Sequence, residues 1–352
     1  MINAYGMQLT REELLERVSS MSQIAGARVF QYTEGKACGV KAVEVNTGDG
    51  LVFTVLPDRG MDIGAARFRN IPVSWQSKVG VVSPKFFENQ GHEWLRSFYG
   101  GLLATCGLKH VGEPVQDGNV FHGLHGRVSN TPAERFWIDE YWDGDDYVIK
   151  VTGKVRETVI YGENLVLTRE IKCIYGQNRI FVKDSVQNEG YTDSPFMIMY
   201  HINQTFPIVS EYSRFYTSAD NVEAANDAAK ETGDDFSKID APIKDYQFKT
   251  FIHNMPMDRD KVYQAIINEN LELGVYIAYN PKTLPVGNQW KQLGQQDYAV
   301  AMEPANTYNV GIVEARKNGW LPVLKPGETA EINLEIGVLS GAQEIESFKA
   351  KL

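Results

Sequence analysis

The feature that most constrains this chain is a two-residue alternation of apolar and polar side chains, repeated in short segments between turns. The clearest segment runs from Ala330 to Val338, where every second residue is apolar and the residues between are mostly polar. Two more such segments, 165–173 and 180–186, flank the turn 175–178. This period predicts strands with one buried face, and many short strands at hairpin spacing predict a mainly β sandwich.

Only one segment favours a helix. Thr10 and Glu13 have the spacing of a capping box, in which each side chain satisfies a backbone amide at the start of a helix. Leu14, Val18 and Met21 then fall on one helical face. We therefore expect a short N-terminal helix over residues 10–22.

A polar segment at 219–244, rich in Asp, Ala and Lys, lies between two strand regions. Such a long irregular insertion is typical of a mobile loop or of a lid over a functional site. Glycine and proline are scattered along the chain and form no linker. We therefore expect residues 1–352 to form a single domain, with a possible lid loop at 219–244.

Composition limits the partners. A net charge of −10 argues against nucleic acid, because binding to phosphates needs clustered cations. No apolar run is long enough to span a bilayer, and no secretory signal or nucleotide-binding glycine motif is visible, so we expect no membrane partner. Three widely separated cysteines suit reduced thiols and a cytoplasmic location. The oligomeric state stays open, a homodimer being one alternative.

Two histidines have surroundings that suit ligand binding. His125 lies between Gly123 and Gly126, and glycines allow a close approach to the backbone. His201 follows an apolar strand and precedes the polar residue Asn203, so we expect it at a strand end that faces a ligand. A histidine is more often a hydrogen-bonded structural residue, and we keep that interpretation for the histidines at 92, 110 and 253.

Glu303 is a third candidate. If 298–303 is a strand, Ala299, Ala301 and Glu303 share one face. A carboxylate beside two small residues has room for a partner, and a buried carboxylate without a partner is costly. The sequence supports a salt bridge and a substrate-facing base about equally.

Four further residues are candidates for substrate binding. Asp58 and Arg59 lie in a charged cluster at a strand end, where a salt-bridge network holding a turn is the somewhat stronger interpretation. Gln289 and Trp290 offer a polar arm and a ring face, the combination that commonly holds a sugar, although a lone tryptophan is more often part of a core.

These motifs, in this order, resemble the aldose 1-epimerase (galactose mutarotase-like) superfamily, and a less-characterised bacterial branch of it. The resemblance covers roughly residues 39–339. It is carried by Leu124–Arg127, by Tyr200–Asn203, by Glu303–Pro304 with Trp290 before it, and by turns at 182–190 and 324–329. The chain departs from the family pattern at Tyr200, where the family has asparagine, and in lacking the aromatic pair after the second histidine.

The resemblance implies a galactose mutarotase-like β-supersandwich and interconversion of the α and β anomers of a free sugar, without cofactor or metal. It implies that Glu303 is the base, that His201 is the acid and that His125 binds a sugar oxygen. Arg127 and Arg59 would favour an anionic sugar, and Asn203 would complete the binding site.

Three alternatives remain, one of which is epimerisation at a carbon other than C1 or of a keto-sugar. The fold also occurs in non-catalytic carbohydrate-binding modules, and fold alone does not fix function. A metal-dependent sugar isomerase or lyase could instead use His110, His122 and His125. His122 and His125 would point to opposite faces of a strand, so joint ligation requires a turn at Gly123.

Overall fold

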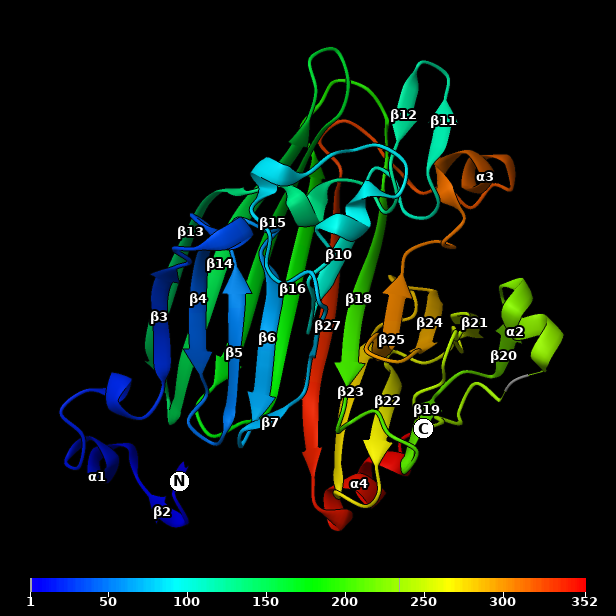
Figure 1. Cartoon of the computed structure of the whole chain (residues 1–352). Coiled ribbons are helices and arrows are strands. Elements are labelled where there is room, and N and C mark those ends of the chain that lie inside the picture. Colours follow the sequence, from blue (N-terminus) through cyan, green and yellow to red (C-terminus); the bar gives the residue numbers. More distant parts are fainter. Residues whose placement is uncertain (1, 234) are drawn as a thin grey trace.

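The computed structural model describes residues 2–233 and 235–352 and contains three large antiparallel sheets. The largest has eight strands (Figure 1). In spatial order they are β13 (Ala133–Asp143), β14 (Asp146–Thr158), β15 (Asn164–Ile174), β16 (Arg179–Asn188), β27 (Thr329–Ser340), β23 (Leu273–Tyr279), β22 (Val262–Asn268) and β19 (Ser213–Thr217).

Two further sheets pack against this one through a shared apolar core. The five-stranded sheet comprises β3 (Gly26–Gln31), β4 (Lys41–Asn46), β5 (Leu51–Leu56), β6 (Asp62–Phe68) and β7 (Ile71–Pro72). The six-stranded sheet comprises β10 (Ala104–Leu108), β18 (Met197–Thr205), β25 (Tyr298–Ala305), β24 (Val286–Leu293), β21 (Lys249–Asn254) and β20 (Asn221–Ala224). Figure 1 shows the blue five-stranded sheet in front of the green strands of the large sheet.

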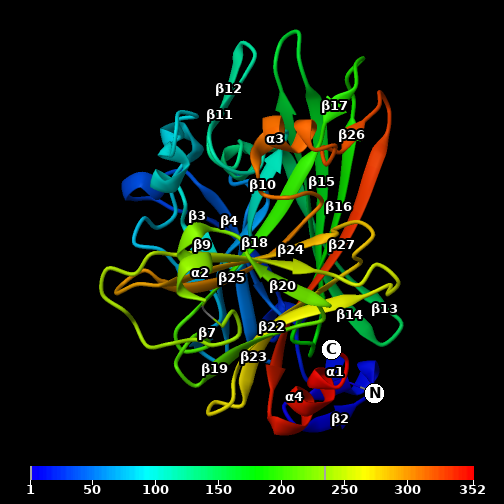
Figure 2. The ribbon, with the colours of Figure 1, turned by 90° about the vertical axis from the view of Figure 1, so that its right-hand side faces the viewer.

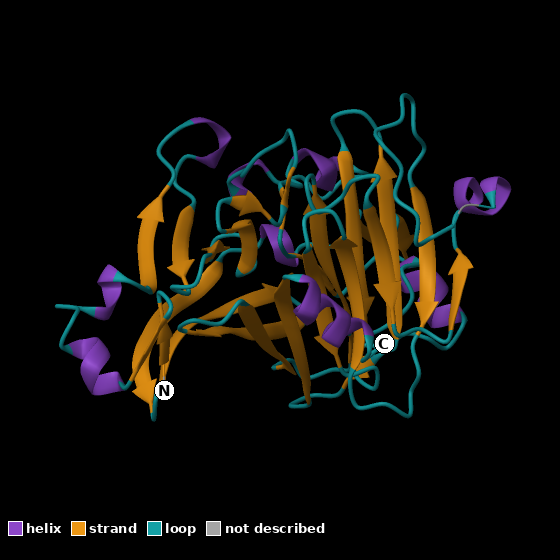
Figure 3. Cartoon of the chain, turned by 90° about the horizontal axis from the view of Figure 1, so that it is seen from below, coloured by secondary structure: helices purple, strands orange, loops and turns teal. Residues whose placement is uncertain are grey.

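Smaller elements fill the ends and connections. The two-stranded pairs are β1 (Ile2–Ala4) with β2 (Met7–Leu9), β8 (Trp75–Gln76) with β9 (Gly100–Gly101), β11 (Val115–Asp117) with β12 (Val120–His122), and β17 (Ser194–Pro195) with β26 (Val323–Leu324). The helices are α1 (Arg11–Leu15), α2 (Asp227–Thr232), α3 (Gly311–Lys317) and α4 (Ala342–Lys349). Figure 3 shows how short they are beside the strands, and Figure 2 places α3 beside β11 and α4 at the opposite end.

The structure confirms the mainly β fold. The predicted strands at 165–173, 180–186 and 330–338 lie within β15, β16 and β27, which are consecutive neighbours in the eight-stranded sheet. No helix in the described part of the chain has the length and apolarity required to cross a membrane.

The N-terminal helix is shorter than expected. The capping box forms as predicted, with Thr10 accepting from the Glu13 amide and the Glu13 carboxylate returning to the Thr10 amide, but α1 ends at Leu15. A separate 3₁₀ turn covers Met21–Gln23. One turn of helix buries only Leu14, so the apolar face that suggested residues 10–22 is divided between two short elements.

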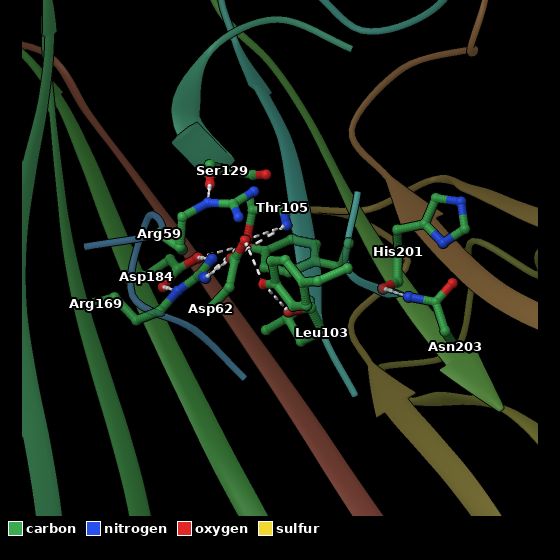
Figure 4. A network of polar contacts seen from close by, with 11 residues as sticks. Arg59, Asp62, Leu103, Thr105, Ser129, Arg169, Asp184, His201 and Asn203 are labelled. Atoms are coloured by element: carbon green, nitrogen blue, oxygen red, sulfur yellow. Dashed lines mark hydrogen bonds and ion pairs between the residues drawn. The ribbon is translucent and has the colours of Figure 1, made fainter. Parts of the chain in front are cut away.

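A buried ion-pair network joins the large sheet to the other two. Arg169 on β15 contacts Asp184 on β16 at 2.6 Å and Asp62 on β6 at 3.0 Å, and all three side chains are fully buried. Thr105 on β10 donates a hydrogen bond to Asp62 (Figure 4). Tyr200 on β18 donates one to Asp184 and completes the network. Because bare charges are costly in a core, each member depends on its partners.

Asp184→Asn should lower the free energy of unfolding by about 3–5 kcal/mol, because it leaves the Arg169 charge buried with half its compensation. Urea unfolding followed by circular dichroism measures this change. The control is Glu331→Gln, which removes a surface pair with Lys183 that is about half exposed and should cost about 0–1 kcal/mol. Equal losses in the two variants would show that the buried network contributes no more than a surface pair.

Two core histidines make folding sensitive to acid. His110 and His253 are almost completely buried, and burial lowers the pKa of each to about 4. Since the unfolded chain takes up protons at about pH 6.5 and the folded chain does so only at lower pH, acid favours the unfolded chain. The stability due to neutral His110 and His253 is complete above about pH 6.5 and is lost as the pH falls toward 4.

In His253→Gln, the loss of stability between pH 6.5 and 4 should be shallower than in the parent by up to about 1.4 kcal/mol per pH unit. The amide can still bond to Gln289, the partner of the histidine ring, but it does not titrate. Chemical denaturation at half-unit pH steps gives both slopes. Parallel curves across this range would contradict the assignment.

Candidate active site

The central pair of the site lies on two adjacent strands. The register of β18 and β25 pairs Ile202 with Met302 and Asn203 with Ala301, so His201 and Glu303 project from the same face of the six-stranded sheet. His201 Nε2 lies 2.9 Å from Glu303 Oε1, and both residues are no more than 5 % exposed. A proton donor and a carboxylate are thus held in direct contact beneath the surface.

Small residues make room for this pair. Ala299, Ala301 and Glu303 project from one face of β25, as the sequence predicted, while Val300 and Met302 pack in the core between the sheets. Glu303 therefore has a buried partner, the His201 ring, as a buried carboxylate requires. A pair of acid and base side chains is also what proton transfer requires, so the same contact is compatible with a catalytic role.

His125 lies beside this pair, in the loop after β12. Its ring centre is 6.4 Å from that of His201, and its backbone has a left-handed φ of 56°. Hydrogen bonds from Gly107 to the His125 carbonyl and from the His125 amide to Gly112 hold that conformation. Strained backbone of this kind persists where surrounding contacts fix it, and it is enriched at functional sites.

Burial determines the protonation of His125, because it lowers the pKa of the ring to about 3, with a further contribution from His201. Nδ1 accepts a hydrogen bond of 3.4 Å from the Gly112 amide, so the neutral ring carries its hydrogen on Nε2. His125 can therefore donate a hydrogen bond but is a poor acid or base near neutral pH.

The glycines around His125 serve the backbone and not a ligand. A Cβ at Gly126 would lie 2.5 Å from the Gly107 carbonyl, and a Cβ at Gly123 would lie 2.9 Å from Asn89 Oδ1. Other atoms do approach the backbone of these glycines closely, as expected, but they belong to the protein itself. These contacts fix the loop that carries His125.

Aromatic rings form a wall around the pair. The rings of Phe98 and Trp290 lie 5.1 and 5.6 Å from His201, and Trp94 lies 5.0 Å from His125. Trp75 contacts both Phe98 and Trp290 at 5.7 Å. The sequence indicated Trp290 but not Trp75, Trp94 or Phe98, because the chain around these three has no regular period to show which residues share a face.

Phe98 and Trp94 belong to residues 77–99, which we call the cover segment. It runs between β8 and β9 with only two short 3₁₀ turns, 84–86 and 93–96. On its outer side a surface cavity of about 710 Å³ is lined by both ends of the segment, at 78–81 and 92–96, and by the loop at 34–37.

Asn203 projects from the same face of β18 as His201, but its side-chain nitrogen already has hydrogen-bond partners. Nδ2 donates to the carbonyls of Gly100 and Gly101 at 3.3 and 3.2 Å, and to that of His201. Within residues 2–233 and 235–352, Asn203 Oδ1 and His201 Nδ1 are buried without a hydrogen-bond partner. Buried polar atoms of this kind require water or a ligand.

Arg59 and Asp58 both bond to backbone groups of the protein. Arg59 is fully buried, and its guanidinium donates at 2.6 Å to the carbonyl of Ser129 (Figure 4). It also donates to the carbonyls of Val82 and Ser97 at 2.8 and 3.0 Å. Asp58 accepts a hydrogen bond from the Lys41 amide. The structural interpretation was the better one, although carbonyl groups take the place of the expected salt bridges.

Gln289 projects away from the His201–Glu303 pair, and Arg127 is exposed. Gln289 precedes Trp290 on β24, so the two side chains project from opposite faces of the sheet. Gln289 bonds instead to His253 and to the Phe236 carbonyl. Arg127 is exposed, and its positive charge opposes the rise that burial causes in the pKa of Glu157.

The segment 219–244 occupies a different face from the one a lid would cover. It contributes β20 to the sheet edge and contains α2, and its residue 234 lies outside the described residues. The carbonyls of Asp235, Phe236 and Asp240 accept hydrogen bonds from Lys291, Gln289 and Tyr298, on the face of the sheet opposite His201. The cover segment occupies the place expected for this lid.

The alternative metal site finds no support in the geometry. Both ring nitrogens of His110 have backbone partners, the Glu113 carbonyl and the Ile312 amide, while its ring stacks on His122 at 5.2 Å. Within the described parts of the chain, no group of three His, Cys, Asp or Glu residues has metal-binding geometry.

Comparison with known proteins identifies the family and the fold of this chain. A family model described as a domain of unknown function, DUF4432, matches residues 37–338. A crystal structure of a candidate aldose 1-epimerase from Klebsiella pneumoniae is 26% identical, with a TM-score of 0.89 over 94% of this chain and 89% of that one. A search among curated proteins finds no match.

More distant structures share the fold. A galactose mutarotase-like protein from Clostridium acetobutylicum is 13% identical, with a TM-score of 0.62 over 90% of this chain and 99% of that one. A galactose 1-epimerase from Lactobacillus acidophilus is also 13% identical, with a TM-score of 0.58 and the same coverages. The chain therefore belongs to the DUF4432 family, and it has the galactose mutarotase-like β-supersandwich fold.

Proposed function

We propose that this protein is a sugar mutarotase, which interconverts the α and β anomers of a free aldose without a cofactor. The observation that carries the proposal is the 2.9 Å contact between His201 Nε2 and Glu303 Oε1, buried and walled by aromatic rings. The likeness to a candidate aldose 1-epimerase and to a galactose 1-epimerase supports the same class of reaction.

Ring opening uses the two groups together. Glu303 takes the proton of the C1 hydroxyl while the His201 imidazolium gives its Nε2 proton to the ring oxygen. The C1–O bond of the ring then breaks and C1 becomes an aldehyde. Because one proton leaves the sugar as another arrives, no free ionic intermediate forms, and such concerted transfer is worth about 10²- to 10⁴-fold in rate.

Ring closure reverses these roles. After rotation about the C1–C2 bond, His201 removes the proton from the hydroxyl of the former ring oxygen, which attacks the opposite face of the aldehyde. Glu303 returns its proton to the carbonyl oxygen. The product is the other anomer, and both side chains end in the states in which they began.

The neighbouring groups suit a sugar. His125 is neutral and carries its hydrogen on Nε2, so it can donate to a sugar oxygen without joining the proton transfer. Asn203 Oδ1, a buried acceptor without a partner among the described residues, can accept a hydrogen bond from a sugar hydroxyl. Trp290 offers a ring face for the C–H side of the sugar, while Phe98 and Trp94 exclude water.

Glu303→Gln should lower kcat/KM for anomer exchange by about 10²- to 10⁴-fold, because the amide cannot take the C1 proton. We would add protein to freshly dissolved single anomers of neutral and anionic sugars and follow exchange by NMR saturation transfer. The ranking of the sugars also tests the anionic preference that the resemblance implied.

The matched control is Glu331→Gln, which makes the same substitution at an exposed carboxylate on β27 and should leave kcat/KM unchanged. Sugar binding without acceleration by the parent protein would instead favour the carbohydrate-binding module. Equal activity of Glu303→Gln and the parent would exclude Glu303 as the base.

His125→Gln should lower kcat/KM by about tenfold while leaving the shape of the pH–rate profile between pH 5 and 9 unchanged. The reason is that burial holds the pKa of His125 at about 3, below this range, so the ring contributes a hydrogen bond and no titration. Initial rates at half-unit pH steps measure both effects. A profile that loses one of its limbs in His125→Gln would show that the ring titrates during catalysis.

A further inference from the structure

Arg59 is unusual because a full charge is buried to hold backbone carbonyls. Its side chain is completely enclosed, and within the described residues it forms no salt bridge with a carboxylate. Burial accordingly lowers the pKa of its guanidinium, with Asp62 and Tyr99 acting in the opposite direction. A buried charge costs several kcal/mol unless strong hydrogen bonds compensate it, so a side chain that merely fills space would be better apolar.

The three acceptors lie on two segments that surround the proposed active site. Val82 and Ser97 are near the two ends of the cover segment, and Ser129 follows the loop that carries His125. The guanidinium also lies 4.8 Å from the ring centre of Tyr99, the last residue of the cover segment. The planar guanidinium of Arg59 therefore joins the cover segment to the His125 loop. A shorter side chain, or one with a single donor group, could not reach all three carbonyls.

Arg59 acts on the proposed catalytic groups indirectly, through residues of the cover segment. Ser97 is followed directly by Phe98, whose ring lies 5.1 Å from His201. The amide and hydroxyl of Ser97 both donate to the Trp94 carbonyl at 3.0 Å, and the Trp94 ring lies 5.0 Å from His125. The carbonyl of Ser97 thus fixes the backbone that places both rings.

The chain directly after the cover segment is held by a different side chain. Asn203 binds the carbonyls of Gly100 and Gly101, just beyond the cover. Between Val82 and Ser97, the side-chain contacts that hold the segment are more exposed, such as His92 with Glu113 and Asn89 with the Phe121 carbonyl. The polar side-chain contacts of the cover segment are therefore more buried at its ends than in its middle.

We propose that Arg59 is a positioning residue of the active site, which orders the cover segment so that Phe98 and Trp94 hold His201 and His125 in their reactive geometry. It acts through these rings and does not contact the sugar. The effect on rate rests on the proposed mutarotase function, whereas the effect on the cover segment is independent of that function.

The test compares Arg59→Lys, which keeps the charge but not the planar guanidinium, with the parent and with Arg156→Lys. Arg156 makes a matched control because it also joins separate segments, through Glu134, Asn164 and Glu189, on β14 and away from the cover. Hydrogen exchange measured by mass spectrometry reports the cover directly. Saturation-transfer NMR on the sugar that the parent exchanges fastest gives kcat and KM.

In Arg59→Lys, amides of residues 82–98 should exchange about tenfold faster while β18 and β25 keep their protection. The value of kcat should fall by about 10²-fold with a much smaller change in KM, because catalytic groups are displaced while the groups that bind the sugar remain. Arg156→Lys should change neither quantity.

Phe98→Leu provides a second variant in case Arg59→Lys does not fold. It keeps the carbonyl bonds of Arg59 but removes the ring beside His201, so kcat should fall while exchange in the cover stays near that of the parent. Full activity of Phe98→Leu would overturn the proposal, as would a folded Arg59→Lys with parental exchange in the cover. A parent without mutarotase activity would refute the proposed function, while the exchange result would still decide whether Arg59 orders the cover.

Discussion

The structure depends on the fixed register of β18, because alternate residues of this strand serve two different layers. Tyr200 projects into the interior and donates to Asp184 in the buried ion-pair network, whereas His201 projects from the other face toward Glu303. A shift of one residue would exchange these faces and leave both the network and the site incomplete. The network that stabilises the sandwich therefore also fixes the position of the proposed acid.

Two buried arginines illustrate how differently a core can use the same charge. Arg169 lies between two carboxylates and joins strands of different sheets, so its role is to hold the layers together. Arg59 has carbonyl partners on irregular segments, so its role is to order chain that has no ladder of its own. Irregular backbone over a site requires such side-chain contacts, since its polar groups have no strand partners.

Much of the fold and part of the site followed from local patterns. The two-residue period predicted the strands at 165–173 and 330–338, because alternation of polarity reflects one buried face wherever the sheet lies. The same reasoning placed Ala299, Ala301 and Glu303 on one face. It failed for Gln289, which was grouped with Trp290 by adjacency although adjacent residues on a strand point apart.

By itself, the sequence determined the strands, the capping box and the order of motifs that placed His125, His201 and Glu303 together. Only the tertiary structure decided that Arg59 is enclosed, that residues 77–99 cover the site and that 219–244 packs on the other face. The physical reason is that strand patterns are local, whereas a charged side chain or an irregular segment takes its role from partners distant in the sequence. Ser97 and Ser129 show this for Arg59, because nothing near residue 59 in the chain indicates that their carbonyls will meet it.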